Sequence, residues 1–281
     1  MLTALLSLAT STLFGVGDFL GGFASKRESS VNVTANAHVV GFVLFTLGLL
    51  LFPAPFAWHD VRMGLISGVS GGVGVGALYA ALARGRMSIV APITAALSGS
   101  LPAAYDFIQG TQVGPFAIAG LALALVATII VSASSGEAEE GQKEMPPSAL
   151  WLSFLAGFGF SGGFIAFSLA SPASGMWPLA SARVTSMLLF AALALITTRR
   201  LSVDRTVRLQ TFGAGVTDAA ANITMITAIR IGPLAIASVL GSLYPVVTIL
   251  LARIVLGERL SPLQWFGVLL ALVAVILAAL P

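Results

Sequence analysis

The sequence predicts an all-α membrane protein in which ten transmembrane helices form two inverted five-helix repeats around a central cavity. Three observations support this fold class: the composition, a series of ten long apolar runs, and a repeat that relates the two halves. Of the 281 residues, 57% are hydrophobic and 9% are charged, and the mean hydropathy is +1.00. A chain of this composition has too few polar side chains to cover the surface of a soluble globule.

Ten apolar runs are long enough to cross the hydrocarbon core of a membrane, which takes roughly 17–25 residues of helix. Helices are the expected spanning element because lipid offers no partner for an unpaired backbone group. Charged or turn-forming residues separate the runs, for example at 26–28, 84–86 and 199–200. The predicted spans are residues 3–23, 32–52, 62–83, 88–108, 114–134, 148–169, 176–197, 208–229, 233–255 and 262–280.

An internal repeat divides the chain into two similar halves. Residues 110–115 with Gly120 match residues 257–262 with Gly267 at a constant offset. An acidic linker, residues 135–147, separates the first half (1–134) from the second (148–281), so each half holds five spans. An odd number of spans inserts the second copy in the opposite direction. Inverted repeats are typical of secondary transporters, whose substrate site lies between the halves near the bilayer midplane.

Charge placement supports opposite insertion of the two halves. The basic loops of the first half follow its first and third spans, whereas those of the second half follow its second and fourth. Opposite insertion brings 11 of the 14 basic residues to one face. The positive-inside rule makes this face cytoplasmic and leaves both termini outside. The residues are Lys26, Arg27, Arg84, Arg86, Lys143, Arg199, Arg200, Arg205, Arg208, Arg253 and Arg259.

Several classes of function are excluded by the same sequence. The net charge of +3 is spread over short loops and not over a basic patch, which argues against nucleic-acid binding. The chain has no cysteine, which excludes disulfides, thiolate catalysis and cysteine-bound metal. It also has no Gly-rich phosphate loop, metal-spaced His cluster or Ser/His/Asp arrangement, so no cofactor or metal is expected. The first span lacks a basic start and a cleavage pattern, so we expect a retained helix and not a signal peptide.

Three segments resemble the EamA type of the drug/metabolite transporter superfamily: residues 85–92 (GRMSIVAP), 241–245 (GSLYP) and 257–262 (GERLSP) leading to Gly267. The resemblance covers essentially the whole chain. It implies two inverted repeats around a central cavity, a carrier and not an enzyme, and export of small metabolites, often amino acids, across the bacterial inner (plasma) membrane.

The sequence departs from this resemblance at two points. Thr111 stands where the repeat and the family pattern favour Glu, so any role of that acid applies only to Glu258. Relatives are usually drawn with cytoplasmic termini, whereas the charge count places the termini outside. Both orientations stay open.

The buried charges are the first candidates for a binding site, because an ionisable side chain inside a span usually faces a water-filled path or a partner. Arg183 and Asp218 lie near the middle of the seventh and eighth spans, and Asn222 shares a helix face with Asp218. One hypothesis is that Arg183 binds a substrate carboxylate while Asp218 and Asn222 hold an amino or hydroxyl group. The alternative is an Arg183–Asp218 ion pair that only joins two helices.

The resemblance indicates which helices face inward, and on that basis Tyr79, Phe160 and Tyr244 are predicted to line the cavity. The expected ligand is a small polar or amphipathic metabolite such as an amino acid, moved outward by alternating access. An uncoupled facilitator is the alternative. The expected partners are the substrate, protons as a candidate coupling ion, and the lipid bilayer, with the chain a monomer or weak homodimer.

Asp18 and His38 lie at comparable depth in the first and second spans and form a candidate proton relay, because His titrates near neutral pH. The alternative places both side chains at the headgroup level. A competing class is an intramembrane aspartyl protease, since residues 15–18 (GVGD) and Tyr105-Asp106 match the two motifs of such enzymes. The order of the motifs is reversed, however, and Asp106 is expected to be interfacial.

Glycines at four-residue spacing mark the third span as a helix that packs closely against its neighbours. They are Gly64, Gly68, Gly72 and Gly76. The proline residues of the fourth and ninth spans, Pro92, Pro102 and Pro245, are expected to kink these helices.

Overall fold

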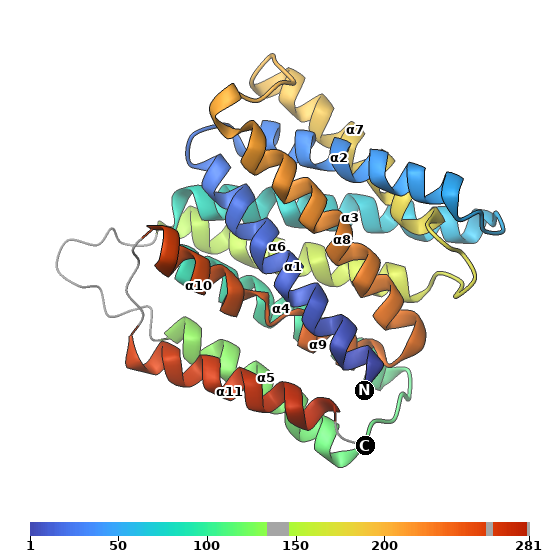
Figure 1. Ribbon diagram of the computed structural model, residues 1–281, viewed down its shortest axis with the longest axis vertical. Coiled ribbons are helices and arrows are strands. Elements are labelled where there is room, and N and C mark those ends of the chain that lie inside the picture. Colours follow the sequence, from blue (N-terminus) through green and yellow to red (C-terminus); the bar gives the residue numbers. More distant parts are fainter. Residues whose placement is uncertain (134–145, 257–260, 280–281) are drawn as a thin grey trace.

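The computed structural model describes residues 1–133, 146–256 and 261–279 (Figure 1). These ranges are helical and contain no strand. Most of the acidic linker, with Lys143, and the loop with Glu258 and Arg259 lie outside the described residues. The helices are α1 (Leu2–Ser25), α2 (Ser30–Leu51), α3 (Trp58–Arg84), α4 (Met87–Ile108), α5 (Pro115–Ala133), α6 (Pro147–Ser168), α7 (Trp177–Thr197), the short 3-10 helix η2 (Arg205–Val207), α8 (Arg208–Ile231), α9 (Leu234–Gly241), α10 (Tyr244–Leu256) and α11 (Pro262–Ala279).

Each predicted span coincides with a helix to within a few residues, except the ninth. That span is divided into α9 and α10 at Ser242 and Leu243, just before Pro245. Proline has no backbone N–H and its ring collides with the carbonyl four residues earlier, here that of Gly241. Pro92 and Pro102, in contrast, lie inside α4, which stays continuous.

Six segments in the described part of the chain are long and apolar enough to cross a membrane. They are α1, α2, α3, α6, α7 and the α9–α10 segment Leu234–Val255. The length and composition of these helices suit a protein that crosses the membrane several times.

Helices of one half pack mainly on helices of the other. α1 contacts α8 and α3 contacts α6; α2 contacts α8 and α3 contacts α7. Suppose that each helix of the first half is exchanged with its counterpart in the second: α1 with α6, α2 with α7, α3 with α8 and α5 with α11. The α1–α8 contact then corresponds to α3–α6, and α2–α8 corresponds to α3–α7. The α2–α7 and α5–α11 contacts are each formed by two counterparts and are unchanged. The described helices therefore pack in a pattern that is symmetric between the halves.

The directions of the helices follow the same symmetry. Figure 1 shows α5 and α11 side by side at one edge, running in opposite directions. In this view the α1–α2 and α3–α4 connections lie on the left and the α7–α8 connection lies at the top, left of centre, whereas the start of α1 and the end of α11 lie at the lower right. The basic residues of these three connections therefore share one end of the molecule.

Close packing of α3, predicted from its glycines, is confirmed. A Cβ atom added at Gly68 would lie 2.3 Å from the carbonyl oxygen of Ala182 on α7, and one at Gly72 would lie 2.7 Å from the Cβ of Ser186. Gly74 faces α6 in the same way, 3.0 Å from the backbone nitrogen of Phe160. The α3 backbone therefore touches both α6 and α7, which carry candidate site residues.

A buried carboxylate, that of Glu28, joins the α1–α2 connection to the α7–α8 connection. Glu28, after α1, accepts hydrogen bonds from Arg200 at 2.7 and 2.9 Å and from the backbone N–H groups of Ser29 and Asp204 at 2.8 and 3.2 Å. Burial alone raises the pKa of Glu28, but the two N–H donors and the Arg200 guanidinium together lower it below its ordinary value. The α1–α2 and α7–α8 connections are thus held to each other at one end of the bundle.

Candidate functional site

Arg183 and Asp218 meet in the interior, as their positions along the helices predicted. Arg183 extends from α7 past Gly41 of α2, where an added Cβ would lie 3.0 Å from the Nε atom. Its Nη2 atom forms an ion pair with Asp218 of α8. The guanidinium also lies over the ring of Phe45, 5.6 Å from the centroid. A glycine on α2 thus leaves room for a long cationic side chain, and an aromatic face stabilises it.

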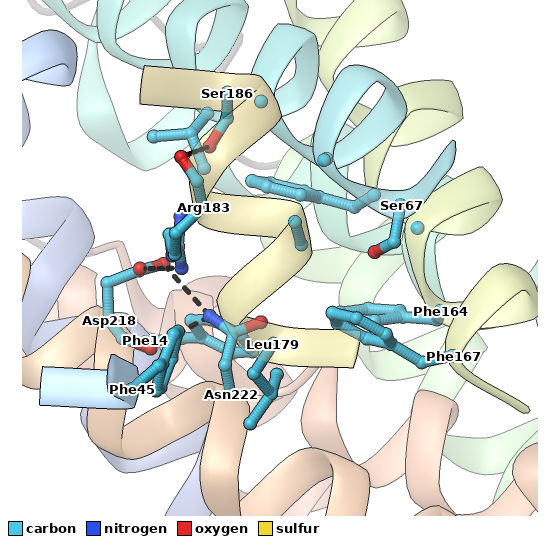
Figure 2. Close-up of a pocket in the computed structure, with 17 residues that line it drawn as sticks. Phe14, Phe45, Ser67, Phe164, Phe167, Leu179, Arg183, Ser186, Asp218 and Asn222 are labelled. Carbon is cyan, nitrogen blue, oxygen red and sulfur yellow. Dashed lines mark hydrogen bonds and ion pairs between the residues drawn. The ribbon is translucent and has the colours of Figure 1, made fainter. Parts of the chain in front are cut away.

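Asn222 completes this polar group. It lies one turn after Asp218 on α8, and its Nδ2 atom donates to the Asp218 Oδ1 atom at 3.2 Å and to the Asp218 carbonyl at 2.8 Å. Figure 2 shows Arg183, Asp218 and Asn222 converging from α7 and α8. A guanidinium has five N–H donors. Within the described residues only the Nη2 atom of Arg183 has a hydrogen-bond partner, so the group keeps donors for a ligand.

This polar group lines a narrow cavity with about 440 Å³ of empty space, counting the part that is open to the outside. The walls come from both halves: α1, α2 and α3 on one side, and α6, α7 and α8 on the other. Figure 2 shows Phe164 and Phe167 across the cavity from the polar group. Gly71 of α3 also lines it, and an added Cβ there meets no atom within 4 Å. A charged wall therefore faces an apolar wall, as in most small-molecule sites.

A second and much smaller cavity of about 10 Å³ adjoins the first, with room for one group the size of a water molecule or an ammonium group. Its walls include Asp18, Ser98 and Tyr244. Phe14, Phe160 and Phe164 line both cavities. The ring centroids of Phe14 and Phe164 lie 6.3 Å apart, and those of Phe160 and Phe164 lie 6.4 Å apart. These three rings form an aromatic partition between the two spaces.

The other predicted site residues are placed as follows. Phe160 lines both cavities and Tyr244 lines the second, whereas Tyr79 lines neither. The Tyr79 ring is buried against Gly21, where an added Cβ would lie 2.1 Å from its Cζ atom. His38 is buried beside Phe190, with ring centroids 5.9 Å apart, and lines neither cavity.

The predicted Asp18–His38 relay has no hydrogen bond to support it. Neither ring nitrogen of His38 has a partner among the described residues. Asp18 is only 7% exposed and lines the second cavity, so its side chain faces the interior and is not solvated. The sequence did not predict that Asp18 faces inward, because its position seven residues before the end of α1 gives its depth along the helix and not the face on which it lies.

Asp106 has a structural position at the end of α4. Its Oδ1 atom accepts from the Thr111 hydroxyl at 2.8 Å, and its Oδ2 atom accepts from the backbone N–H of Ala235 at 2.8 Å. The latter contact caps the first turn of α9. Both oxygens are thus used at a helix end, and Asp106 lines neither of the two cavities that contain Asp218 and Asp18. This gives no support to a shared-proton dyad of Asp18 and Asp106.

Among the residues of the first cavity that were not predicted are Phe45, Ser67 and Ser186. Phe45 follows Gly41 by four residues, so the pair forms one face of α2 that receives the Arg183 side chain. Ser67 lies one residue before Gly68, and Ser186 lies three residues after Arg183. The spacing of three or four residues along a helix, counted from Gly41 and from the buried Arg183, could have indicated Phe45 and Ser186 as neighbours of the site.

Comparison with known proteins identifies the second half. Residues 147–280 match the EamA-like transporter family. No curated protein matches the chain in sequence. A solved chain described only as "Crystal structure of protein" aligns with a TM-score of 0.75 at 17% identity, over 99% of this chain and 96% of its own length. At that identity the likeness shows a shared fold alone.

Proposed function

We propose that this multi-pass membrane protein, whose residues 147–280 are an EamA-like transporter family domain, is a secondary carrier that exports a small polar or amphipathic metabolite by alternating access. The observation that carries the proposal is a cavity between the two halves with a buried ion pair in its wall. An amino acid is the expected type of substrate, and the bacterial inner membrane the expected location.

The packing pattern supports two inverted repeats. Contacts between helices are symmetric under exchange of the halves, and related helices such as α5 and α11 run in opposite directions (Figure 1). In carriers built this way, one repeat rocks against the other around a fixed central site. The first cavity lies where such a motion opens a path, because its walls come from both repeats. The narrow width of the cavity fits a closed state that widens on opening.

The polar group suits a substrate with both a carboxylate and an amino or hydroxyl group. A substrate carboxylate competes with Asp218 for the guanidinium of Arg183, and charge-assisted pairs of this kind are among the stronger hydrogen bonds. Asp218 and Asn222 then hold the amino or hydroxyl group. The buried ion pair thus serves as a binding site that is satisfied when the substrate is absent.

A resistance screen tests this function. Cells overproducing the protein are challenged with toxic amino-acid analogues, and export appears as growth at higher concentrations. Arg183→Ala removes the carboxylate partner, so we expect about tenfold or greater loss of transport, from hydrogen bonds to a charged group worth about 1.5–3 kcal/mol. Gly71→Leu places a large side chain in the empty space of the cavity and is expected to abolish export.

Gly71→Ala is the matched control, since its single methyl group enters open space, and it is expected to keep export. The amount of folded protein in the membrane is measured for every variant. If Arg183→Ala and Gly71→Leu both export like the unmodified protein at equal amounts, this cavity is not the transport site. If protein is lost with Arg183→Ala, the ion pair is structural and Gly71→Leu alone decides.

A further inference from the structure

The second cavity is enclosed by parts of the chain that meet only in the folded molecule. Asp18 comes from α1, Ser98 from α4, and Ser242 and Tyr244 from the break between α9 and α10. Phe14 lies one helical turn before Asp18 and so shares its face of α1. The break between α9 and α10 thus places Ser242 and Tyr244 in the wall of this cavity.

Asp18 is a buried carboxylate without a partner. It is 7% exposed, and no hydrogen bond or ion pair joins it to any residue that the structure describes. An isolated ionised carboxylate is costly to bury, and such a group is normally paired or neutralised. Asp218, the other buried carboxylate near the cavities, already shares its charge with Arg183. Asp18 is therefore the carboxylate beside the cavities that can still pair with a positively charged ligand.

The remaining polar groups of the cavity present acceptors. The Ser98 hydroxyl donates to the Ala95 carbonyl at 3.2 Å, and the Ser242 hydroxyl donates to the Val239 carbonyl at 2.7 Å. The Tyr244 hydroxyl donates to the Ala91 carbonyl at 3.4 Å. Ser98 and Tyr244 are also hydrogen-bonded to each other. Because the hydroxyl hydrogens are used within the protein, the lone pairs that remain can only accept from a ligand. A ligand that brings several N–H donors and a positive charge fits this set.

Aromatic rings form the other walls. Phe14, Phe160, Phe164 and Tyr244 line the cavity, and the Phe14 and Tyr244 centroids lie 6.5 Å apart at an interplanar angle of 72°. Aromatic faces attract organic cations and also accept their apolar parts. A metal ion prefers several oxygen ligands from carboxylates and carbonyls. Within the described residues no group of three or more His, Asp or Glu is gathered anywhere.

We propose that the second cavity binds the ammonium group of a small organic amine, with Asp18 as counter-ion, the hydroxyl oxygens of Ser98 and Ser242 as acceptors, and the Phe14–Phe160–Phe164 partition as its apolar wall. The physiological meaning of this site rests on the proposed carrier, whose substrate class it narrows to amines and amino compounds. The partition shared by both cavities places the amine site beside the carboxylate site at Arg183.

Calorimetric titration of the purified protein in detergent tests the site apart from transport. The probe is n-butylammonium, and n-butanol is the neutral compound of similar size. We expect n-butylammonium to bind and n-butanol to bind at least tenfold more weakly. Asp18→Asn keeps the shape of the side chain and removes its charge, so it is expected to weaken n-butylammonium binding at least tenfold. Asp204→Asn, in an exposed linker, is the matched control and is expected to leave it unchanged.

Three outcomes overturn the proposal: no binding of n-butylammonium to the unmodified protein, equal binding of n-butanol, or displacement of the amine by equal concentrations of Na⁺, which indicates an inorganic cation site. If Asp18→Asn fails to fold, Ser98→Ala takes its place: it removes a proposed acceptor of the second cavity, and unchanged n-butylammonium binding then assigns the amine to Asp218 and Asn222 of the first cavity and overturns the proposal. If the protein binds the amine but shows no export, the carrier proposal fails and the proposed amine site stands. If it exports but does not bind the amine, the amine site fails and the carrier proposal stands.

Discussion

At the scale of single residues, each buried charge in this protein has a distinct neighbourhood. Arg183 and Asp218 neutralise each other, Glu28 is satisfied by four hydrogen bonds, and Asp18 has no partner among the described residues. A paired charge at a helix junction stabilises the fold, whereas an unpaired one beside a cavity is available for a ligand. Glu28 is therefore structural, whereas Arg183 and Asp218, which line the first cavity, and Asp18, which lines the second, are placed to bind a ligand.

Glu28 makes stability depend on acid pH. Its pKa in the folded protein is lowered from the ordinary value of 4.5, so its contribution is complete above that value and is lost as the pH falls through the folded pKa. We expect the midpoint of thermal unfolding to fall over this acid range. Glu28→Gln removes that part of the pH dependence and lowers stability at neutral pH by about 1.5–3 kcal/mol.

Tryptophan fluorescence of the purified protein follows this unfolding. Asp204→Asn is the control, because the Asp204 carboxylate is 60% exposed and its contact with Arg200 is long, at 3.4 Å. A Glu28→Gln protein with the same acid profile and the same neutral stability as the unmodified protein would contradict the role of this carboxylate.

The meeting of Arg183 and Asp218 could be predicted because both lie at similar depth in neighbouring spans of one half. The inward position of Asp18 could not, since depth was counted from the loop and the facing helix belongs to the other half. Tyr79 shows the converse: an aromatic residue of a central helix was expected in the cavity, but Gly21 of α1 receives its ring in the core. Glycine spacing predicted that α3 packs closely against other helices, but nothing in the spacing within one half shows which residue of the other half is contacted.

At the scale of elements, the glycines of α3 have two different environments. Gly68 contacts the α7 backbone, where an added Cβ would lie 2.3 Å from the Ala182 oxygen, whereas Gly71 faces open space. Gly68→Ala is expected to push the helices apart and to lower stability by about 1–3 kcal/mol. Gly71→Ala is expected to be neutral or to stabilise by up to about 1 kcal/mol, because alanine favours helix over glycine. Thermal unfolding of the two variants under one set of conditions measures the contrast, and equal midpoints would show that this α3–α7 contact does not hold the bundle together.

Helix positions were predictable because an apolar run long enough to cross lipid has one favourable structure. The break between α9 and α10 was foreseen only as a kink at Pro245. The same residue type leaves α4 continuous at Pro92 and Pro102. Whether a proline bends or divides a helix depends on which neighbours satisfy the freed backbone groups, and those neighbours are set by tertiary packing.

At the scale of the whole molecule, the helices of the two halves pack in a symmetric pattern around a cavity, and residues 147–280 match the EamA-like transporter family. The repeat in the sequence indicated this correspondence between the halves. The division of the interior into two cavities could not be predicted, because Phe14 belongs to one half and Phe160 and Phe164 to the other. The aromatic partition exists only where the halves meet.

Alternating access is the central claim, and the absence of cysteine from the chain makes a direct measurement simple. Gly71→Cys places a single thiol on the cavity wall, in space that is empty in this structure. Ala81→Cys, at a fully buried core position, is the control. A membrane-impermeant maleimide is applied to right-side-out and to inverted membrane vesicles. The account predicts labelling of Gly71→Cys from both sides and of Ala81→Cys from neither; labelling of Gly71→Cys from one side only, or from neither, would contradict it.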